Sequence, residues 1–350
     1  MTTVSRTSAS GTTATGWSAT GRLTASALAL AVGVVAVSAV GLMLGSRALP
    51  LTDVLAALAG QDSGDASIIV WDQRLPRTLL GLLVGAALGI GGAVAQGLTR
   101  NALADPGLLG VSAGAALAIV IGTFTFGITA LAPQLVLGIV GATAAGAAVL
   151  LLGTRSSIAA TPQGFALIGV AISAILGSIA STLVLLDANT LDEYRFWLVG
   201  SLAGRGTSTL TAVAPVILVG IALALGCSRL LDGLALGDDA AQALGVGLRR
   251  ARILAGTAVI VLTGAAVAAA GPIAFVGLAV PHAARALSGP RASWLLPFSG
   301  ALGAVLLVTA DILGRIISRP SELQAGVVTA LVGAPVALLL ITRARSGGAV

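Results

Sequence analysis

Arginine carries most of the chemical functionality in this sequence. All 19 basic residues are Arg, since the chain contains no Lys, and they stand against 13 acidic residues. A guanidinium group binds carboxylates through paired hydrogen bonds, so these residues suit ion pairs and the recognition of acidic partners. A phosphate-binding loop of the GxxxxGK[ST] type needs a Lys, and so does a Schiff-base cofactor. The chain is therefore not a conventional P-loop ATPase, and ATP hydrolysis would need another subunit.

No pattern in the sequence predicts a catalytic, cofactor or metal site. The chain has one His and one Cys, His282 and Cys227, and neither has a metal-binding partner near it in sequence. One imidazole does not build a metal site alone, so a structural hydrogen bond is the favoured interpretation of His282. Cys227 is interpreted as a packed thiol, and no nucleophile–base pair accompanies either residue.

One carboxylate, Asp311, lies well inside an apolar stretch, with Arg315 four positions further along. An acid within a membrane helix is costly and by default functional, which raises the alternative of a proton carrier. Residues four apart share a helix face, so Arg315 can neutralise Asp311. A structural ion pair is the favoured interpretation, and the proton carrier stays open.

The stretch TRNALADPGLLG (99–110) concentrates polar residues between two uncharged runs, 78–99 and 106–154. It is interpreted as a turn between two membrane helices, with a functional constriction as the sharper alternative. Arg100 and Asp105 are expected to hold the turn at the membrane surface, and Pro106 to begin the next helix.

The elements that position these residues are membrane helices. The chain is 57% apolar with 9% charged residues, and its mean hydropathy is +1.04. A bilayer core of about 30 Å needs about 20 apolar residues as helix, and uncharged runs of that order recur without the alternation of a β-barrel. These runs are 23–46, 78–99, 106–154, 156–186, 206–228, 253–284, 292–310 and 323–342. They predict an all-α polytopic membrane protein with about ten spans, two within 106–154 and one plus a shorter second one within 253–284.

Charge distribution predicts the topology. With ten spans, the segments on the side of the termini hold 12 Arg and the opposite segments hold seven, which places both termini in the cytoplasm. The net charge of +6 then reflects topology rather than nucleic-acid binding. Residues 1–23, rich in Ser, Thr and Gly, are expected to be a disordered cytoplasmic tail, and 24–350 the transmembrane domain.

Two connecting segments are longer than a turn requires. The inner segment 227–252 includes a short predicted helix, Asp238 to Leu244, ended by Gly245, and a docking role is plausible for it. On the outer side, 187–206 carries Tyr194, Phe196 and Trp197, which suit a helix at the membrane interface. A weak sequence similarity between residues 85–98 and residues 264–278 favours an inverted repeat, as transporters often have.

Several ordered motifs resemble a known family, the iron-chelate (siderophore) and cobalamin uptake permeases of the FecCD type. The motifs are RLPRTLLGLLVGAALGIGGAVAQGLTRNALADPGLLGVSAGAAL (74–117), LGDDAAQALGV (236–246), GPIAFVGLAVPHAAR (271–285), LLPFSGALGAVLLVTADILGR (295–315) and ELQAGVVTALVGAPVALLL (322–340). The resemblance covers about residues 25–342. Ala102 and Gln324 stand where the family usually has Pro, so the local backbone is expected to be looser there.

The resemblance implies a type II ABC importer permease in the bacterial cytoplasmic membrane. Its partners would be a second permease chain, identical or not, two cytoplasmic ATPase subunits, an extracytoplasmic substrate-binding protein and membrane lipid. The cargo would be a ferric siderophore, with cobalamin or haem as alternatives, and nucleic acid would not be a partner. An ion-coupled secondary transporter working without an ATPase is the alternative class, although such proteins use chains of buried acids or His.

The resemblance also assigns roles to residues. Docking of the binding protein is expected at Arg74, Arg77 and Arg315. The cytoplasmic gate is expected at Asn101 and Leu103, with a second gate region at Thr161, Pro162 and Gln163. A coupling segment at about 232–250 is expected to dock on the ATPase through Asp238, Asp239, Gln242, Leu244, Gly245 and Arg249.

Overall fold

The structure is a computed structural model that describes residues 19–45, 48–61, 64–155, 162–318 and 321–346. Within these ranges all regular secondary structure is helical, which confirms the expected all-α class. Seven of the described helices are long and apolar enough to cross a membrane, and they lie in α1, α3–α4, α6, α7, α9, α12 and α14.

The helices follow the uncharged runs of the sequence. In chain order they are α1 (Ala19–Met43), α2 (Leu51–Leu58), α3 (Asp65–Ile68), η1 (Ile69–Arg74), α4 (Leu75–Thr99), η2 (Pro106–Leu109), α5 (Val111–Phe126), α6 (Leu131–Arg155), α7 (Pro162–Leu186), α8 (Ala188–Leu198), α9 (Thr207–Gly226), α10 (Ser228–Ala235), α11 (Asp238–Ala243), α12 (Leu248–Ala270), α13 (Val276–Ser288), α14 (Ala292–Ile317) and α15 (Ala325–Ser346). The short helices join the long ones at the two ends of the bundle.

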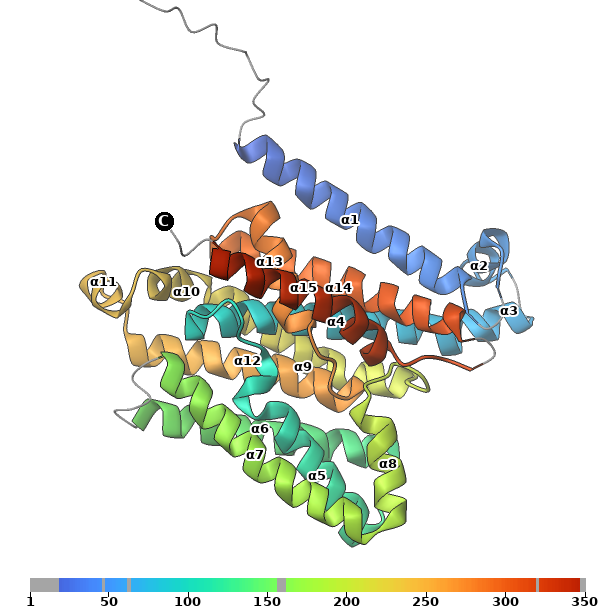
Figure 1. Cartoon of the computed structure of the whole chain (residues 1–350). Helices are drawn as coiled ribbons and strands as arrows, with labels where there is room; N and C mark the ends of the chain where they lie inside the picture. Colours follow the sequence, from blue (N-terminus) through green and yellow to red (C-terminus); the bar gives the residue numbers. More distant parts are fainter. Residues whose placement is uncertain (1–18, 46–47, 62–63, 156–161, 319–320, 347–350) are drawn as a thin grey trace, which may run out of the picture.

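The centre of the bundle is formed by α4, α12 and α14, with α1 along one side and α5 to α7 on the opposite side (Figure 1). In the most apolar part of α4 and of α12, 78% of the residues are buried, against 6% in α1 and 17% in α7. Apolar helices that the chain leaves this exposed must contact lipid or other membrane chains. The core helices are thus the scaffold, and α1 and α7 form the periphery.

Glycine brings the central helices together. A Cβ at Gly85 of α4 would stand 2.3 Å from the carbonyl oxygen of Gly303 in α14, and one at Gly89 would stand 2.2 Å from the carbonyl oxygen of Ser299. Small residues let membrane helices approach closely, so that dispersion contacts replace the missing hydrophobic drive. Any larger side chain at these two positions would push α4 and α14 apart.

The run 253–284 forms two helices, as the sequence predicts. The helix α12 ends at Ala270, and α13 begins at Val276. Gly271 and Phe275, at the two sides of the break, both have positive φ angles, 75° and 68°. Gly271 ends α12, because a positive φ turns the chain off the helical path and glycine adopts it without strain. The break leaves a non-helical segment among the packed helices.

The short helices lie at opposite ends of the bundle, α10 and α11 at one end and α2 and α3 at the other (Figure 1). The helix predicted from Asp238 to Leu244 is confirmed as α11, which ends one residue earlier, at Ala243, and Gly245 lies two residues after its end with φ of 77°. The predicted helix around Tyr194 is confirmed as α8. However, Trp197 is buried, with 8% of its surface exposed, so it packs into the core and does not face the headgroups.

Candidate functional site

Asp311 is the centre of a buried charge cluster at the end of the bundle that carries α2 and α3. Its Oδ1 accepts a hydrogen bond from Nη2 of Arg77 at 2.8 Å, and its Oδ2 accepts one from Nε of Arg315 at 2.9 Å. The Asp311 and Arg315 side chains are each 3% exposed. The predicted Asp311–Arg315 pair is therefore present, and Arg77 joins it from α4. With two guanidinium groups on one carboxylate, the cluster is built as a structural ion network.

Two arginines of the cluster also hold the end of α1. Nη1 of Arg74 donates to the carbonyl oxygens of Leu42 and Met43 at 2.7 and 2.8 Å. Nη1 of Arg315 donates to those of Gly41 and Leu44 at 3.2 Å each. The last carbonyls of a helix lack helical partners, and cations there are favourable. Arg74 and Arg315 thus fasten α1 to α4 and α14 from within the protein.

Arg77 is the most accessible of the three arginines expected to dock a partner. Its side chain is 13% exposed, and its Nη1 forms an ion pair with Oε2 of Glu322 at 2.8 Å. Glu322 is 31% exposed and lines a cavity of about 410 Å³ together with Glu193, Arg205 and Gln324. Burial lowers the pKa of Arg205. The cavity therefore brings charges of both signs together at this end of the bundle.

The stretch TRNALADPGLLG lies near the opposite end and is a turn, as predicted. Arg100 ends α4 in a left-handed conformation with φ of 49°. Its Nε donates to the carbonyl oxygen of Leu234 at 2.8 Å, and its Nη2 forms an ion pair with Asp238. Nη2 of Arg252 also binds Asp238, at 2.8 Å. The turn is thereby tied to α10, α11 and α12.

The expected gate residues sit on this turn and are both exposed. Oδ1 of Asn101 accepts a hydrogen bond from the backbone N–H of Leu103 at 2.9 Å, a local turn that asparagine favours. Asp105 differs from expectation, because it does not hold the turn at the surface. Its Oδ1 accepts from Gly107 N at 2.8 Å, and its Oδ2 lies 3.4 Å from where a Cβ on Gly277 of α13 would stand. Asp105 therefore faces the interior of the bundle.

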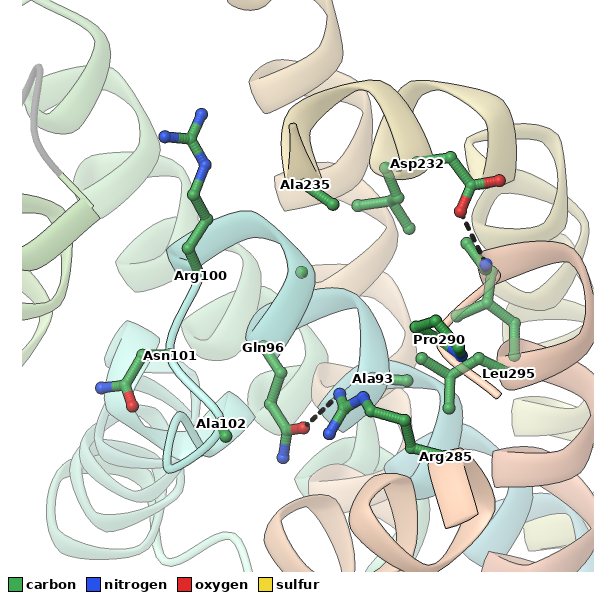
Figure 2. Close-up of a pocket in the computed structure, with 14 residues that line it drawn as sticks. Ala93, Gln96, Arg100, Asn101, Ala102, Asp232, Ala235, Arg285, Pro290 and Leu295 are labelled. Carbon is green, nitrogen blue, oxygen red and sulfur yellow. Dashed lines mark hydrogen bonds between the residues drawn. The ribbon is translucent and has the colours of Figure 1, made fainter. Parts of the chain in front are cut away.

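A cavity of about 280 Å³ opens beside this turn (Figure 2). Oε1 of Gln96 accepts a hydrogen bond from Nη2 of Arg285 at 3.1 Å, and Nε2 of Gln96 donates to the carbonyl oxygen of Leu278 at 3.1 Å. Across the cavity, Oδ1 of Asp232 accepts from the backbone N–H of Ala292 at 2.7 Å. These contacts join α4, α13, α10 and α14. Arg100 points away from the Gln96–Arg285 pair (Figure 2).

The chain matches the family model described as the FecCD transport family over residues 30–343. It belongs to this family. It is 45% identical over 312 residues to the ferric enterobactin transport system permease protein FepD of Escherichia coli, covering 89% of this chain and 93% of FepD. It is 37% identical to the Fe(3+)-citrate import system permease protein YfmD of Bacillus subtilis, covering 87% of this chain and 90% of YfmD.

A solved structure shares the fold of this FecCD chain. It is described as an inward-facing conformation of a metal-chelate type ABC transporter, with 29% identity and a TM-score of 0.80. The superposition covers 90% of this chain and 98% of that chain. The FecCD chain is therefore a multi-pass membrane permease, a class of subunit that has no catalytic centre of its own.

The remaining predicted site residues lie at the α11 end or outside the described part. Leu244 is 67% exposed, and the other exposed members of the predicted coupling set are Asp239, Gln242, Gly245 and Arg249. Pro162 and Gln163 begin α7, and their side chains lie outside the described residues, as does the whole of Thr161.

The expectations for His282 and Cys227 have different outcomes. His282 is exposed and makes no hydrogen bond to any residue that the structure describes, so the structural hydrogen bond expected for it is wrong. Within the described ranges, no group of three or more His, Cys, Asp or Glu side chains is placed to hold a metal ion. The free thiol of Cys227 is buried, which confirms the packed interpretation.

The sequence did not predict three of the side-chain contacts at the two ends of the bundle. They are Glu322 on Arg77, Gln96 on Arg285 and Arg252 on Asp238. The partners in the first two pairs are 245 and 189 residues apart in the chain, so no local spacing could reveal them. Arg252 lies 14 residues after Asp238 and belongs to a different helix, so helical spacing does not predict their contact.

Proposed function

We propose that this FecCD chain is the permease subunit of an ATP-binding-cassette importer that moves a ferric siderophore across the cytoplasmic membrane. The observation that carries the proposal is 45% identity to FepD over nearly the full length of both chains. The names of FepD and YfmD both specify iron chelates, which favours such a cargo over cobalamin. A separate ATPase subunit supplies the energy, because the chain has no Lys for a phosphate-binding loop.

The proposed architecture has ten spans with both termini in the cytoplasm. The shorter helices α5, α13 and α15 add to the seven long apolar ones, and the excess of Arg on the side of α11 supports the orientation. The exposed apolar surface of α7, with Leu167, Ile175 and Leu185 each at least 60% exposed, supports a second permease chain across the translocation path. An inverted repeat that relates 85–98 to 264–278 remains part of the proposal.

The two ends of the bundle take different roles in this proposal. At the outer end, Arg77, with Arg74 and Arg315 behind it, receives acidic residues of the extracytoplasmic binding protein. At the inner end, the segment at about 232–250 docks in the ATPase, and exposed Leu244 supports this because an exposed Leu on a short helix suits an apolar cleft. Asn101 and Leu103 form a cytoplasmic gate, and residues 161–163 form the second gate region.

The experiment is uptake into proteoliposomes that contain the complete transporter. Radiolabelled ferric siderophore, haem and cobalamin are compared with binding protein and ATP present. We expect saturable uptake of a ferric siderophore that stops when the ATPase subunit carries a substitution that abolishes ATP hydrolysis. Uptake driven by an ion gradient without the ATPase would instead identify a secondary transporter, and uptake of haem or cobalamin alone would correct the cargo.

A further inference from the structure

The short helix α2 presents an apolar face that no described part of the chain covers. The side chains of Leu51, Leu55 and Leu58 are 48%, 56% and 37% exposed. They are four and three positions apart, so they lie on one face of the helix. A row of leucines this exposed marks a surface that contacts something outside the chain.

The other faces of α2 have different surroundings. Val54 and Ala57 are buried and pack in a small apolar cluster with Val70 of η1. Asp53 is exposed and stands two residues before Leu55, which at about 3.6 residues per turn puts it on the opposite face of the helix. The helix therefore has one side against the protein, one polar side, and an exposed apolar side that faces away from the polar one.

The end of α1 sets the level of α2 in the membrane. The apolar part of α1 runs from Gly21 to Met43 and has 23 residues. This is about 34 Å of helix, against a hydrocarbon core of about 30 Å, so Met43 lies at the boundary between acyl chains and headgroups. The backbone N–H of Leu49, two residues before α2, donates to the carbonyl oxygen of Met43 at 2.9 Å. This hydrogen bond holds the start of α2 at the same boundary.

The surroundings of α2 belong to the lipid-facing side of the bundle. The helix packs on α1, α3 and η1, and the most apolar part of α1 is only 6% buried. The proposed second permease chain would lie across α7, on the side of the bundle opposite α1 (Figure 1). Lipid, and not a second copy of the chain, is therefore the neighbour that this position favours.

Trp71 of η1 extends the apolar face. Its side chain is 46% exposed, and its Nε1 donates to the carbonyl oxygen of Ala57 at 3.0 Å, which places the indole ring beside α2. Tryptophan is enriched where membrane and water meet, because its ring is amphipathic and sits at headgroup level. The ring thus marks the same boundary as the end of α1.

The charges beside the apolar face are acidic. In the described residues from 48 to 61 and from 64 to 73 they are Asp53, Asp65 and Asp72, and all three are exposed. Interfacial helices that bind anionic headgroups carry Lys or Arg on their polar face. An acidic binding protein of the kind proposed for Arg77 would be repelled by these carboxylates. Insertion among the acyl chains is the contact that remains.

We propose that α2 and Trp71 form an interfacial anchor, which inserts Leu51, Leu55 and Leu58 into the lipid leaflet beside α1. A helix of this kind lies in the plane of the interface, with its apolar face in the boundary between headgroups and acyl chains. The lipid is selected by its acyl chains and not by a charged headgroup.

The anchor fixes the level of the arginines proposed for docking. The helices α3, η1 and α4 follow one another directly, so that η1 ends at Arg74 and Arg77 lies in the first turn of α4. Val70 of η1 is fully buried in the cluster that also holds α2. The inference goes beyond the proposed function, because the lipid contact does not depend on the cargo.

The test uses the complete transporter in nanodiscs of phosphatidylcholine, with a nitroxide label on Leu55→Cys. The chain has a single Cys, Cys227, which is buried. ATPase subunits without Cys keep the label specific, and the unsubstituted permease gives the background. Collisions of the label with O₂, which concentrates among acyl chains, are compared with collisions with a water-soluble nickel chelate. We expect the ratio of O₂ to nickel collisions to be several-fold higher than for a label on Asp53→Cys.

Asp53→Cys is the matched control, because it is exposed on the same helix and faces the opposite way. Exchange of half of the phosphatidylcholine for phosphatidylglycerol should leave both ratios unchanged. Leu58→Cys repeats the comparison if Leu55→Cys does not assemble.

Equal ratios at the two positions would overturn the proposal. Protection of Leu55→Cys from nickel that appears only with phosphatidylglycerol would also overturn it, since a charged headgroup would then be the ligand. Protection that appears only after the binding protein is added would make α2 a docking surface for that protein instead. A label shielded from both O₂ and nickel would show a protein contact in place of the lipid.

Discussion

The two ends of the bundle use the same chemistry, Arg with Asp, in opposite ways. At the proposed outer end, which carries α2 and α3, the side chains of Asp311 and Arg315 are each 3% exposed, and Arg315 is hydrogen-bonded to α1. At the proposed inner end, which carries α10 and α11, the side chains of Arg100 and Asp238 are 29% and 30% exposed and join the turn after α4 to α11. Burial makes an ion pair costly to break, whereas solvent makes it cheap to remake.

We propose that this difference is a division of labour between the two ends of the bundle. The outer cluster, Asp311 with Arg77 and Arg315, holds three helices in one arrangement, and in this proposal it passes a docking force into the scaffold. The inner contacts are suited to rearrange when an attached subunit moves, because each exposed ion pair contributes little to stability. Three substitutions test whether the two ends differ in this way.

Asp311→Asn should have the largest effect. It leaves Arg77 and Arg315 without their shared counterion, and removing one partner of a buried ion pair costs about 3–5 kcal/mol. We expect a large fall in the denaturation midpoint of the purified transporter, or failure to accumulate folded protein. The control is Asp192→Asn, whose pair with Arg195 is more than 60% exposed on both sides and should not matter. Equal stability of the two variants would contradict a structural role of the outer cluster.

Arg100→Ala should change coupling more than stability. Its pair with Asp238 is partly exposed, so its loss should cost at most about 1 kcal/mol. Because Arg100 joins the turn of Asn101 and Leu103 to α11, we expect several-fold less cargo moved per ATP hydrolysed. The measurement is the ratio of uptake to ATP turnover in proteoliposomes, with Arg195→Ala as the control. An unchanged ratio would mean that this contact does not transmit motion.

Glu322→Gln should have the smallest effect on stability, within about 0.5 kcal/mol. It removes the carboxylate that occupies Nη1 of Arg77, and this frees the guanidinium for an acidic partner. We expect the binding protein to bind the permease more tightly, by a few-fold. Arg77→Ala should act in the opposite direction and weaken the stimulation of ATP turnover. If the binding protein bound both variants with the same affinity, Arg77 would not be part of the docking surface.

Much of the fold could be predicted from the sequence, because membrane helices correspond to continuous apolar runs in the sequence. The run 78–99 appears as α4, the run 253–284 as two helices, and the inner segment contains α11. The Asp311–Arg315 pair could also be predicted, since its spacing of four is a local helical property. The docking and coupling assignments came from resemblance and remain predictions.

The predictions made from the sequence were wrong where they depended on which side of a segment faces the core. Asp105 was expected at the surface because polar residues in turns usually face water, but the turn folds back against Gly277. Trp197 was expected at the interface, but the end of α8 packs into the bundle. His282 was expected to be hydrogen-bonded, but α13 exposes it.

The class of the protein, its helices and its family could all be predicted from the sequence, since these depend on hydropathy, local spacing and ordered motifs. Which charges meet depends on the tertiary packing. It placed Arg77 between Asp311 and Glu322, and Arg74 on the end of α1. It also turned the Asp105 side chain towards Gly277 of α13. Partnership between charges depends on packing distance and burial, and these arise only when segments hundreds of residues apart are brought together.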